Sequence, residues 1–309
     1  MPAIKISNLT KKFKSFTAVS EISFEVSENR VMGFLGPNGA GKTTTIRMLV
    51  GLSKATSGKI EIDSKEVIFG DSGINKLFGY LPEQPAFYGW MTGIEYLNFV
   101  ADAFGLSKDE KENKTKDLLK LVDLGQSGNK KISTYSNGMK QRLGIAQALV
   151  NDPKVLIMDE PVSALDPIGR REVLNIIENL KKNMTILLST HILSDVDRIC
   201  DDIAIINKGK IIAVSPLSEL KEKYAKEILE VEFNADPASL LQDLAKEAWL
   251  DHYEKNGNCL KIWPKSSKAL QDNLPLKFFS NNAKIGVLKY GLNLPETEVL
   301  FVDLVKDKK

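Results

Sequence analysis

The sequence predicts an α/β protein with a mixed core sheet, a β-rich N-terminal region and a helical insert, followed by a small α+β domain. Strand patterns alternate with helical patterns over residues 1–216, as they do in folds built around a largely parallel sheet. Almost wholly apolar runs at 155–158 and within 184–191 are typical of strands buried on both faces. The pattern changes near residue 217, so we expect a second domain at 217–309.

The N-terminal region is expected to be rich in strands. Alternating residues at 4–7 and 22–26 and the apolar run 31–35 predict three strands. Residues 57–63 read as a turn followed by a strand, and 76–91 as a strand followed by an aromatic, proline-containing loop.

A helical insert is expected at about 92–150, between two halves of the α/β core. Its polar helical patterns gain an apolar face from LLKLVDL at 118–124, and the charged run 108–117 is best read as a solvated helix face. Residues 203–214, which follow the core strands, predict a hairpin: the strands IAII and IIAV are joined by the turn NKGK.

The C-terminal region predicts a small α+β domain. ILEVEF at 228–233 reads as a strand, Pro237 starts a helix, strands flank the turn at 256–258, and Pro295 starts a final helix. No residue there identifies a site, and we expect the domain to stabilise a dimer or to regulate activity.

The composition limits the function classes. With 43% hydrophobic residues, 27% charged residues and a net charge of +2, the chain offers no general attraction to nucleic acid or anionic lipid. We find no apolar stretch long enough to span a bilayer and no signal peptide, so we expect a cytoplasmic protein without direct membrane insertion. Cys200 and Cys259 are too few for a disulfide framework and are interpreted as packing residues.

The most specific motif is GPNGAGKTT at 36–44, a full match to the phosphate-binding loop G-x-x-x-x-G-K-[ST]. Its glycines let successive backbone N–H groups turn toward phosphate oxygens, and the following helix adds its positive N-terminal end. We expect Lys42 to reach the β and γ phosphates and Thr43 to bind Mg²⁺.

Two acidic residues follow a buried strand at Asp159 and Glu160. Asp159 is expected to hold Mg²⁺ through water, and Glu160 to act as the general base that aligns water for attack on the γ-phosphorus. His191 ends the next apolar strand, where its imidazole could hydrogen-bond the γ-phosphate or the water.

A second phosphate site is predicted at YSNGMKQR, residues 135–142, which runs into a helix. Ser136 is a candidate helix cap and Gly138 a position of close approach. Asn137 is a residue type that tolerates a left-handed backbone.

Together these residues resemble a known family. The stretch from about Ile4 to Val214 is similar to the ATPase subunit of an ATP-binding cassette (ABC) transporter, a P-loop NTPase cassette. Five motifs in order support the resemblance: GPNGAGKTT, YSNGMKQR in place of the signature LSGGQ, VLIMDEP, SALD in place of the dimer loop, and the switch histidine His191. The signature departs from the family pattern at Tyr135, Asn137 and Met139.

The resemblance implies how the chain works. Two copies close head to tail, so that each ATP lies between Lys42 of one subunit and Ser136 of the other, and a single subunit hydrolyses ATP poorly. The partner is an integral membrane permease, which places the protein peripherally at the inner face of the cell membrane. YS-x-GMKQR and GYLPE at 79–83 look most like the branch that exports drugs, lipids or polysaccharides.

The resemblance also suggests further contacts. Phe13, or alternatively Phe16, is the adenine-stacking aromatic, although core packing is an alternative for either ring. The loop residue facing Mg²⁺ is Glu83 or Gln84. Candidate permease contacts, with a local core as the alternative, are Phe87, Tyr88 and Trp90.

The expected site is therefore a MgATP site. The catalytic candidates are Glu160, His191 and Lys42. The ATP-binding candidates are Phe13, Gly36, Asn38, Gly39, Ala40, Gly41, Lys42, Thr43, Thr44, Ser136, Gly138 and Asp166. The Mg²⁺ candidates are Thr43, Glu83, Gln84 and Asp159.

The rival interpretation is a soluble cassette ATPase that remodels ribosomes or DNA. Such relatives usually carry two cassettes or a long coiled-coil insertion, whereas this chain has one cassette, a short insert and little net positive charge. His252 has no acidic or cysteine partner at ligand spacing and is interpreted as structural or surface-exposed.

Overall fold

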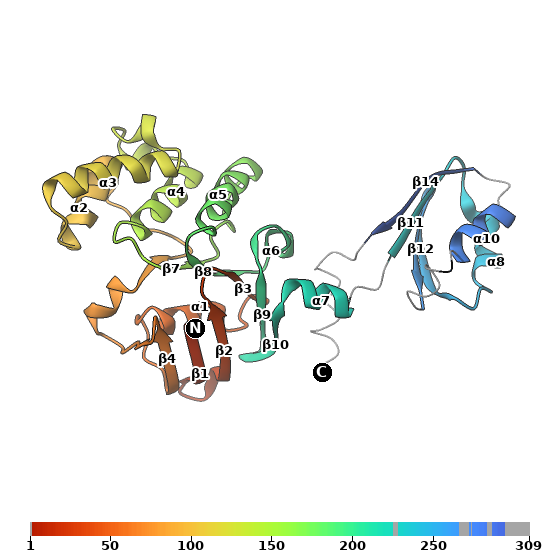
Figure 1. Cartoon of the computed structure of the whole chain (residues 1–309), viewed down its shortest axis with the longest axis horizontal. Helices are drawn as coiled ribbons and strands as arrows, with labels where there is room; N and C mark the ends of the chain where they lie inside the picture. Colours follow the sequence, from red (N-terminus) through yellow and green to blue (C-terminus); the bar gives the residue numbers. More distant parts are fainter. Residues whose placement is uncertain (1, 225–227, 266–271, 273, 283–285, 294–309) are drawn as a thin grey trace. The chain divides into compact units, whose positions relative to one another are not determined.

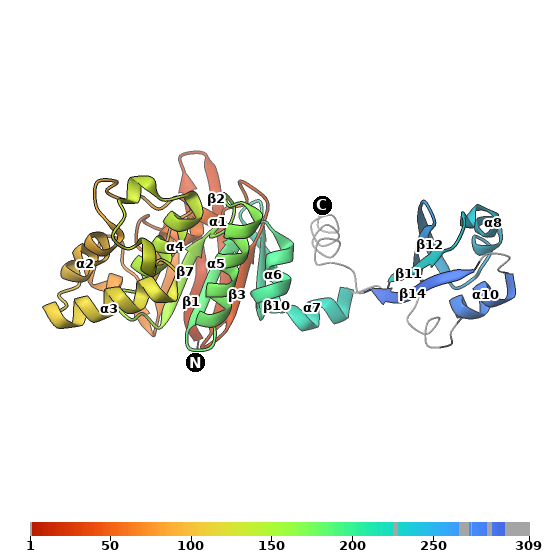
Figure 2. The same ribbon diagram turned by 90° about the horizontal axis from the view of Figure 1, so that it is seen from above.

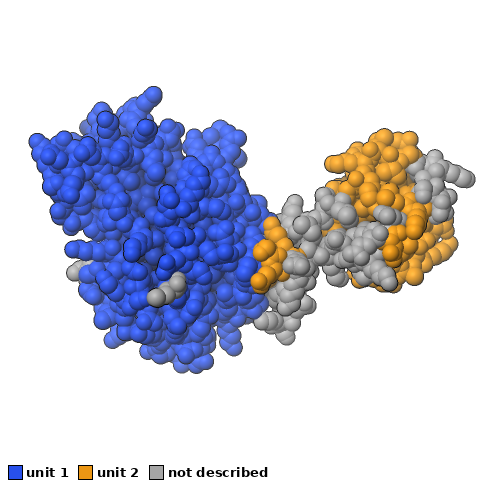
Figure 3. Space-filling model, viewed as in Figure 1, with its two compact units in different colours: residues 1–217, 308 blue, residues 218–307, 309 orange. Residues whose placement is uncertain are grey.

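The computed structural model describes residues 2–224, 228–265, 272, 274–282 and 286–293. The chain divides into two compact units: unit 1 ends at Leu217 and unit 2 begins at Ser218 (Figure 3). No helix within the described ranges is long and apolar enough to cross a bilayer.

A six-stranded sheet forms the centre of unit 1 and confirms the predicted mixed α/β core (Figure 1). Its order is β10-β9-β3-β8-β7-β6, with β10 antiparallel to β9 and the other neighbours parallel. Every residue of β3, β7 and β8 is buried, as expected of strands covered on both faces. The strands are β3 Val31–Leu35, β6 Phe78–Leu81, β7 Val155–Asp159, β8 Thr185–Thr190, β9 Asp202–Asn207 and β10 Lys210–Pro216.

The core sheet is covered on both faces. On one face, α1 (Lys42–Leu49) packs in a single hydrophobic cluster with Met32 and Phe34 of β3 and with strands of the N-terminal sheet. Helices α5 (Pro167–Leu180) and α6 (Leu193–Ile199) lie on the opposite face (Figure 1).

A cysteine of the loop after α6 lies against this second face. A Cβ at Gly33 would lie 2.9 Å from Cys200 Sγ, so Cys200 packs against the sheet, and its burial raises its pKa well above the usual value for a thiol. Both cysteines are free.

The N-terminal sheet has the order β2-β1-β4-β5 and is antiparallel. Its strands are β1 Pro2–Phe13, β2 Phe16–Ser27, β4 Ser57–Ile62 and β5 Lys65–Glu66. The first two are much longer than predicted. Left-handed residues Asn8 and Glu21 and shifts in the pairing register interrupt the alternation of side chains, although the strands continue through them.

The helical insert forms as predicted, with α2 and α3 side by side (Figure 2). Both helices begin with reciprocal capping boxes, Thr92 with Glu95 and Ser107 with Glu110. The last helix of the insert, α4, packs closely against β6 at Gly79. A Cβ there would lie 2.0 Å from the carbonyl oxygen of Ala148 in α4, so this contact requires glycine. The elements of the insert are α2 Gly93–Ala103, α3 Lys108–Leu121, η2 Gly125–Ser127, η3 Ile132–Thr134 and α4 Asn137–Ala148, and a 3-10 turn before β6 is η1 Ser72–Lys76.

Unit 2 is an α+β domain with the antiparallel sheet β12-β13-β11-β14. The order of its elements and the central position of the first and third strands match the split β-α-β arrangement. Leu229, Val231 and Phe233 of β11 pack with Phe278 and Phe279 of α10 in its core. The elements are α7 Leu217–Tyr224, β11 Ile228–Phe233, η4 Pro237–Leu240, α8 Leu241–Leu244, β12 Leu250–Asn256, β13 Cys259–Pro264, α10 Leu274–Asn282 and β14 Val287–Asn293.

Two features of unit 2 differ from the sequence-based expectation. The helix predicted from Pro237 starts as a 3-10 turn, and α10 and β14 were not anticipated. The helix expected from Pro295 lies outside the described residues.

Candidate functional site

The loop between β3 and α1 is shaped by its glycines. A Cβ at Gly36 would lie 2.4 Å from the carbonyl oxygen of Ile206, and a Cβ at Gly41 would lie 2.8 Å from that of Ala18. Gly39 and Gly41 have φ values of 78° and 112°, a region that other residues rarely adopt. Only glycine therefore fits this backbone, which leads directly into the N-terminus of α1.

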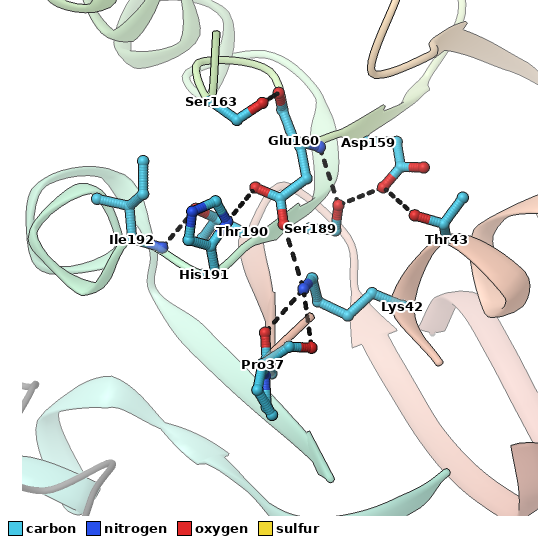
Figure 4. A network of polar contacts seen from close by, with 11 residues as sticks. Pro37, Lys42, Thr43, Asp159, Glu160, Ser163, Ser189, Thr190, His191 and Ile192 are labelled. Carbon is cyan, nitrogen blue, oxygen red and sulfur yellow. Dashed lines mark hydrogen bonds and ion pairs between the residues drawn. The ribbon is translucent and has the colours of Figure 1, made fainter. Parts of the chain in front are cut away.

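Lys42 is the first residue of α1, and its side chain is only 6% exposed. Its Nζ donates a hydrogen bond of 2.7 Å to the carbonyl oxygen of Gly36 and lies 3.2 Å from Glu160 Oε1 (Figure 4). The ammonium group is thus held at the base of the loop, in an ion pair.

Asp159 and Glu160 stand at the carboxyl end of β7. Asp159 is 1% exposed, and its Oδ1 accepts hydrogen bonds from Thr43 Oγ1 at 3.3 Å and Ser189 Oγ at 2.6 Å. Glu160 Oε2 lies 2.9 Å from His191 Nδ1 (Figure 4). The strand order β3-β8-β7 brings these groups together, because the ends of parallel strands meet at one edge of the sheet.

A cavity of about 380 Å³ opens above the loop. It is lined by Phe13, Phe16, Ala18, Asn38, Gly39, Gly41, Lys42, Thr43, Thr44, Glu83, Glu160, Ser163 and His191. The site therefore combines backbone donors, a lysine, carboxylates and a histidine, which suits a phosphorylated ligand.

Two aromatic rings stand at the rim of the cavity. Phe13 and Phe16 are cross-strand partners at the tip of the β1–β2 hairpin, and they are 51% and 63% exposed. Lys11 Nζ lies 4.8 Å from the centre of the Phe13 ring. Neither ring is part of the core, so both are available to stack on a planar group.

Oxygen donors suitable for Mg²⁺ lie in and beside the cavity, although Asp159 itself does not line it. The Thr43 hydroxyl and the Asp159 carboxylate are already adjacent, and Glu83 lines the cavity. Gln84 is exposed and does not line it. Nearby, burial and the Asp159 carboxylate raise the pKa of Tyr80 to about 12, so this phenol stays protonated at neutral pH.

The second predicted phosphate site does not line this cavity. Ser136 caps α4 by accepting a hydrogen bond of 3.2 Å from the N–H of Met139, and Asp166 caps α5 by accepting one of 2.8 Å from Gly169. A Cβ at Gly138 would lie 3.6 Å from the Cα of Gly169, so the two helix N-termini adjoin. Asn137 tolerates a left-handed backbone but does not adopt one here: it is the first residue of helix α4 and is not among the described residues with positive φ.

The loop after β6 carries an aromatic cluster. The ring centroids of Phe87 and Tyr96 are 5.0 Å apart, and those of Tyr88 and Phe99 are 5.9 Å apart. Tyr88 and Trp90 nevertheless remain 51% and 67% exposed. The rings thus form a local cluster with an exposed face.

Ser189 was not singled out from the sequence, and Ser163 was noted only as the first residue of SALD. Ser189 joins Asp159 to the backbone of Glu160, and Ser163 lines the cavity. Ser189 is a polar residue in a largely apolar strand, two residues before His191, and this position could have indicated its role from the sequence.

His252 lies on unit 2, where its exposed ring stacks on the Trp263 ring with the centroids 4.3 Å apart.

Comparisons with known proteins agree with this geometry. Residues 19–163 match the family model described as ABC transporter. The chain is 48% identical over 221 residues to the ABC transporter ATP-binding protein YxlF of Bacillus subtilis (strain 168), covering 71% of this chain and 73% of that protein. It is 42% identical over 225 residues to the bacitracin transport ATP-binding protein BcrA of Bacillus licheniformis, covering 72% of each.

A solved structure also matches. The ATP-binding subunit of an ABC transporter superposes with a TM-score of 0.65 at 31% identity, covering 72% of this chain and 93% of that one. The chain therefore belongs to the family of ABC transporter ATP-binding proteins, whose cassettes bind and hydrolyse ATP.

Proposed function

We propose that two copies of this chain close around two Mg²⁺-ATP molecules and drive export through a separate membrane permease. Similarity to the bacitracin transport protein supports an exporter. The observation that carries the proposal is the cavity itself: it gathers Lys42, Thr43, Glu160 and His191 but is not lined by Ser136.

Residues in and beside the cavity have distinct roles in the proposed reaction. Backbone N–H groups of the loop and Lys42 hold the β and γ phosphates, and Phe13 stacks on adenine. Glu160 accepts the proton of the attacking water, while His191 orients the Glu160 carboxylate and the water. Thr43, Asp159 and Glu83 form the magnesium site, where the cation, when bound, would neutralise phosphate charge.

The second copy supplies what this cavity lacks. Ser136 caps α4 and Gly138 lies in its first turn, at a helix N-terminus that suits a γ-phosphate, and Asp166 caps the adjoining α5. In a twofold dimer each site receives these residues from the opposite subunit.

A mixing experiment tests this arrangement. We expect Lys42→Ala and Ser136→Ala proteins each to be inactive, because every site of either homodimer carries one lesion. A mixed dimer carries both lesions at one site and none at the other. Random pairing should therefore restore about a quarter of wild-type phosphate release, and no recovery in dimers shown to be mixed would contradict the shared site.

The membrane partner is proposed to dock on the aromatic cluster around Tyr88 and Trp90, which places the protein at the inner face of the cell membrane. We expect Tyr88→Ala and Trp90→Ala to reduce co-purification with a polytopic membrane protein while ATP binding is retained. Leu288→Ala, an equally exposed apolar residue of unit 2, is the matched control. Capture of ribosomes or DNA in place of a membrane protein would favour the remodelling ATPase.

The second domain, 217–309, is proposed to stabilise the dimer or to regulate activity. Its own sheet and hydrophobic core support an independent module. A truncation that left dimerisation, ATP hydrolysis and transport unchanged would remove this role.

A further inference from the structure

Ser189 lies between the two acidic residues of the site. It is fully buried on β8, directly paired with Asp159 in the parallel register of β7 and β8. Its Oγ donates a hydrogen bond of 2.6 Å to Asp159 Oδ1 and accepts one of 2.9 Å from the N–H of Glu160 (Figure 4). One hydroxyl therefore contacts both residues without lining the cavity.

The backbone at Glu160 needs such support. Its φ of 48° lies in the left-handed region, which is uncommon for a residue with a side chain and clusters at functional sites. Its N–H is shared between the Ser189 hydroxyl and the Ser189 carbonyl oxygen, at 2.9 and 3.2 Å. This turn directs the carboxylate toward Lys42 and His191 instead of continuing the strand.

The carboxylate of Asp159 is constrained in the same way. Its two side-chain hydrogen bonds, from Thr43 and Ser189, both end on Oδ1. They hold Oδ1 in place, and neither of them uses Oδ2. Such supporting bonds tune the ligands of metal sites.

We propose that Ser189 is a positioning residue for ATP hydrolysis, whose hydroxyl sets the orientation of the Asp159 carboxylate and the backbone turn of Glu160 together. The proposal rests on the roles given above to Asp159 and Glu160. It predicts a defect in turnover and in Mg²⁺ dependence rather than in ATP affinity, because the hydroxyl does not touch the nucleotide cavity.

The same strand supplies a matched control. Thr185 is also buried on β8, and its hydroxyl accepts a hydrogen bond of 2.9 Å from the N–H of Asn29, away from the site. Thr185→Val thus removes a buried hydroxyl of the same strand at constant size. A purely structural role for Ser189 would make the two substitutions equivalent.

The test uses the full-length protein with Ser189→Ala, the near-isosteric Ser189→Cys, Thr185→Val and the reference Glu160→Gln. Three quantities are measured: kcat and KM for ATP, melting temperature, and the Mg²⁺ concentration that gives half of the thermal stabilisation by nucleotide. For both Ser189 variants we expect kcat to fall about 10- to 100-fold and the Mg²⁺ midpoint to rise about tenfold. KM should change less than about threefold, and Thr185→Val should change neither kcat nor the midpoint.

Two results would overturn the proposal. One is turnover of Ser189→Ala within about twofold of wild type while Glu160→Gln is inactive. The other is an equal loss of turnover in Thr185→Val. Normal turnover of Glu160→Gln would instead reject the general-base role of Glu160, and the Mg²⁺ midpoint would still report on Asp159.

Discussion

Lys42 Nζ and Glu160 Oε1 lie 3.2 Å apart, and both side chains are less than a tenth exposed. Lys42 begins the helix that follows β3, and Glu160 directly follows β7; in the sheet, β8 separates these two strands. A buried ion pair of this kind makes each partner depend on the other, because removing one leaves a desolvated charge behind.

Glu160→Gln is expected to retain ATP and lose turnover. The amide keeps the size of the side chain but cannot accept the proton of water, so phosphate release should fall by at least about 100-fold. In the presence of Mg²⁺-ATP the variant should elute as a dimer in size-exclusion chromatography. Glu178→Gln, which alters a surface ion pair with Arg198, is the control, and unchanged turnover in Glu160→Gln would remove the residue from the mechanism.

Lys42→Ala is expected to lose ATP binding and also to lower stability. Glu160 keeps His191 as a partner, so we expect a loss near about 3 kcal/mol, the lower end for breaking a buried pair. The double variant Lys42→Ala/Glu160→Gln should recover part of that loss, because no charge is left unpaired. Denaturant unfolding of the single and double variants measures this coupling, and strict additivity would show that the ion pair does not stabilise the fold.

Phe13→Ala is expected to weaken ATP binding about tenfold by removing a stacking surface, while Phe13→Tyr retains it. Stability should hardly change, because the ring is about half exposed. Fluorescence titration with ATP measures the affinity, and Phe69→Ala, a similarly exposed ring outside the cavity, is the control. A larger effect of Phe16→Ala would assign the stacking role to that ring.

Arg170→Met is expected to destabilise unit 1. Arg170 on α5 pairs at 2.6 Å with Asp195 on α6, whose side chain is 3% exposed. Burial raises the pKa of Asp195, and the guanidinium opposes that rise. Without Arg170 the buried carboxylate loses its hydrogen-bonded partner and keeps only the charge of Arg198 nearby, so we expect the free energy of unfolding to fall by about 3 kcal/mol. The double variant Arg170→Met/Asp195→Asn should be more stable than Arg170→Met alone.

Much of the fold and of the site was predictable because it depends on local pattern. The strand at 31–35, the following helix and the pair of acidic residues after 155–158 stand out in the sequence since backbone geometry and burial restrict which residues fit there. Long-range structure was less predictable. The bulged strands of the N-terminal sheet hide their alternation, and β14 pairs with a strand more than fifty residues away.

The sequence by itself determined the family, the phosphate-binding loop and the identity of the charged groups around it. Only the tertiary structure decided that Glu83 and not Gln84 lines the cavity, that both phenylalanines of the hairpin face it, and that Ser189 joins the two acidic residues. The physical reason is that a motif specifies which groups a segment carries, whereas the contacts among segments depend on strand order and packing over the whole domain.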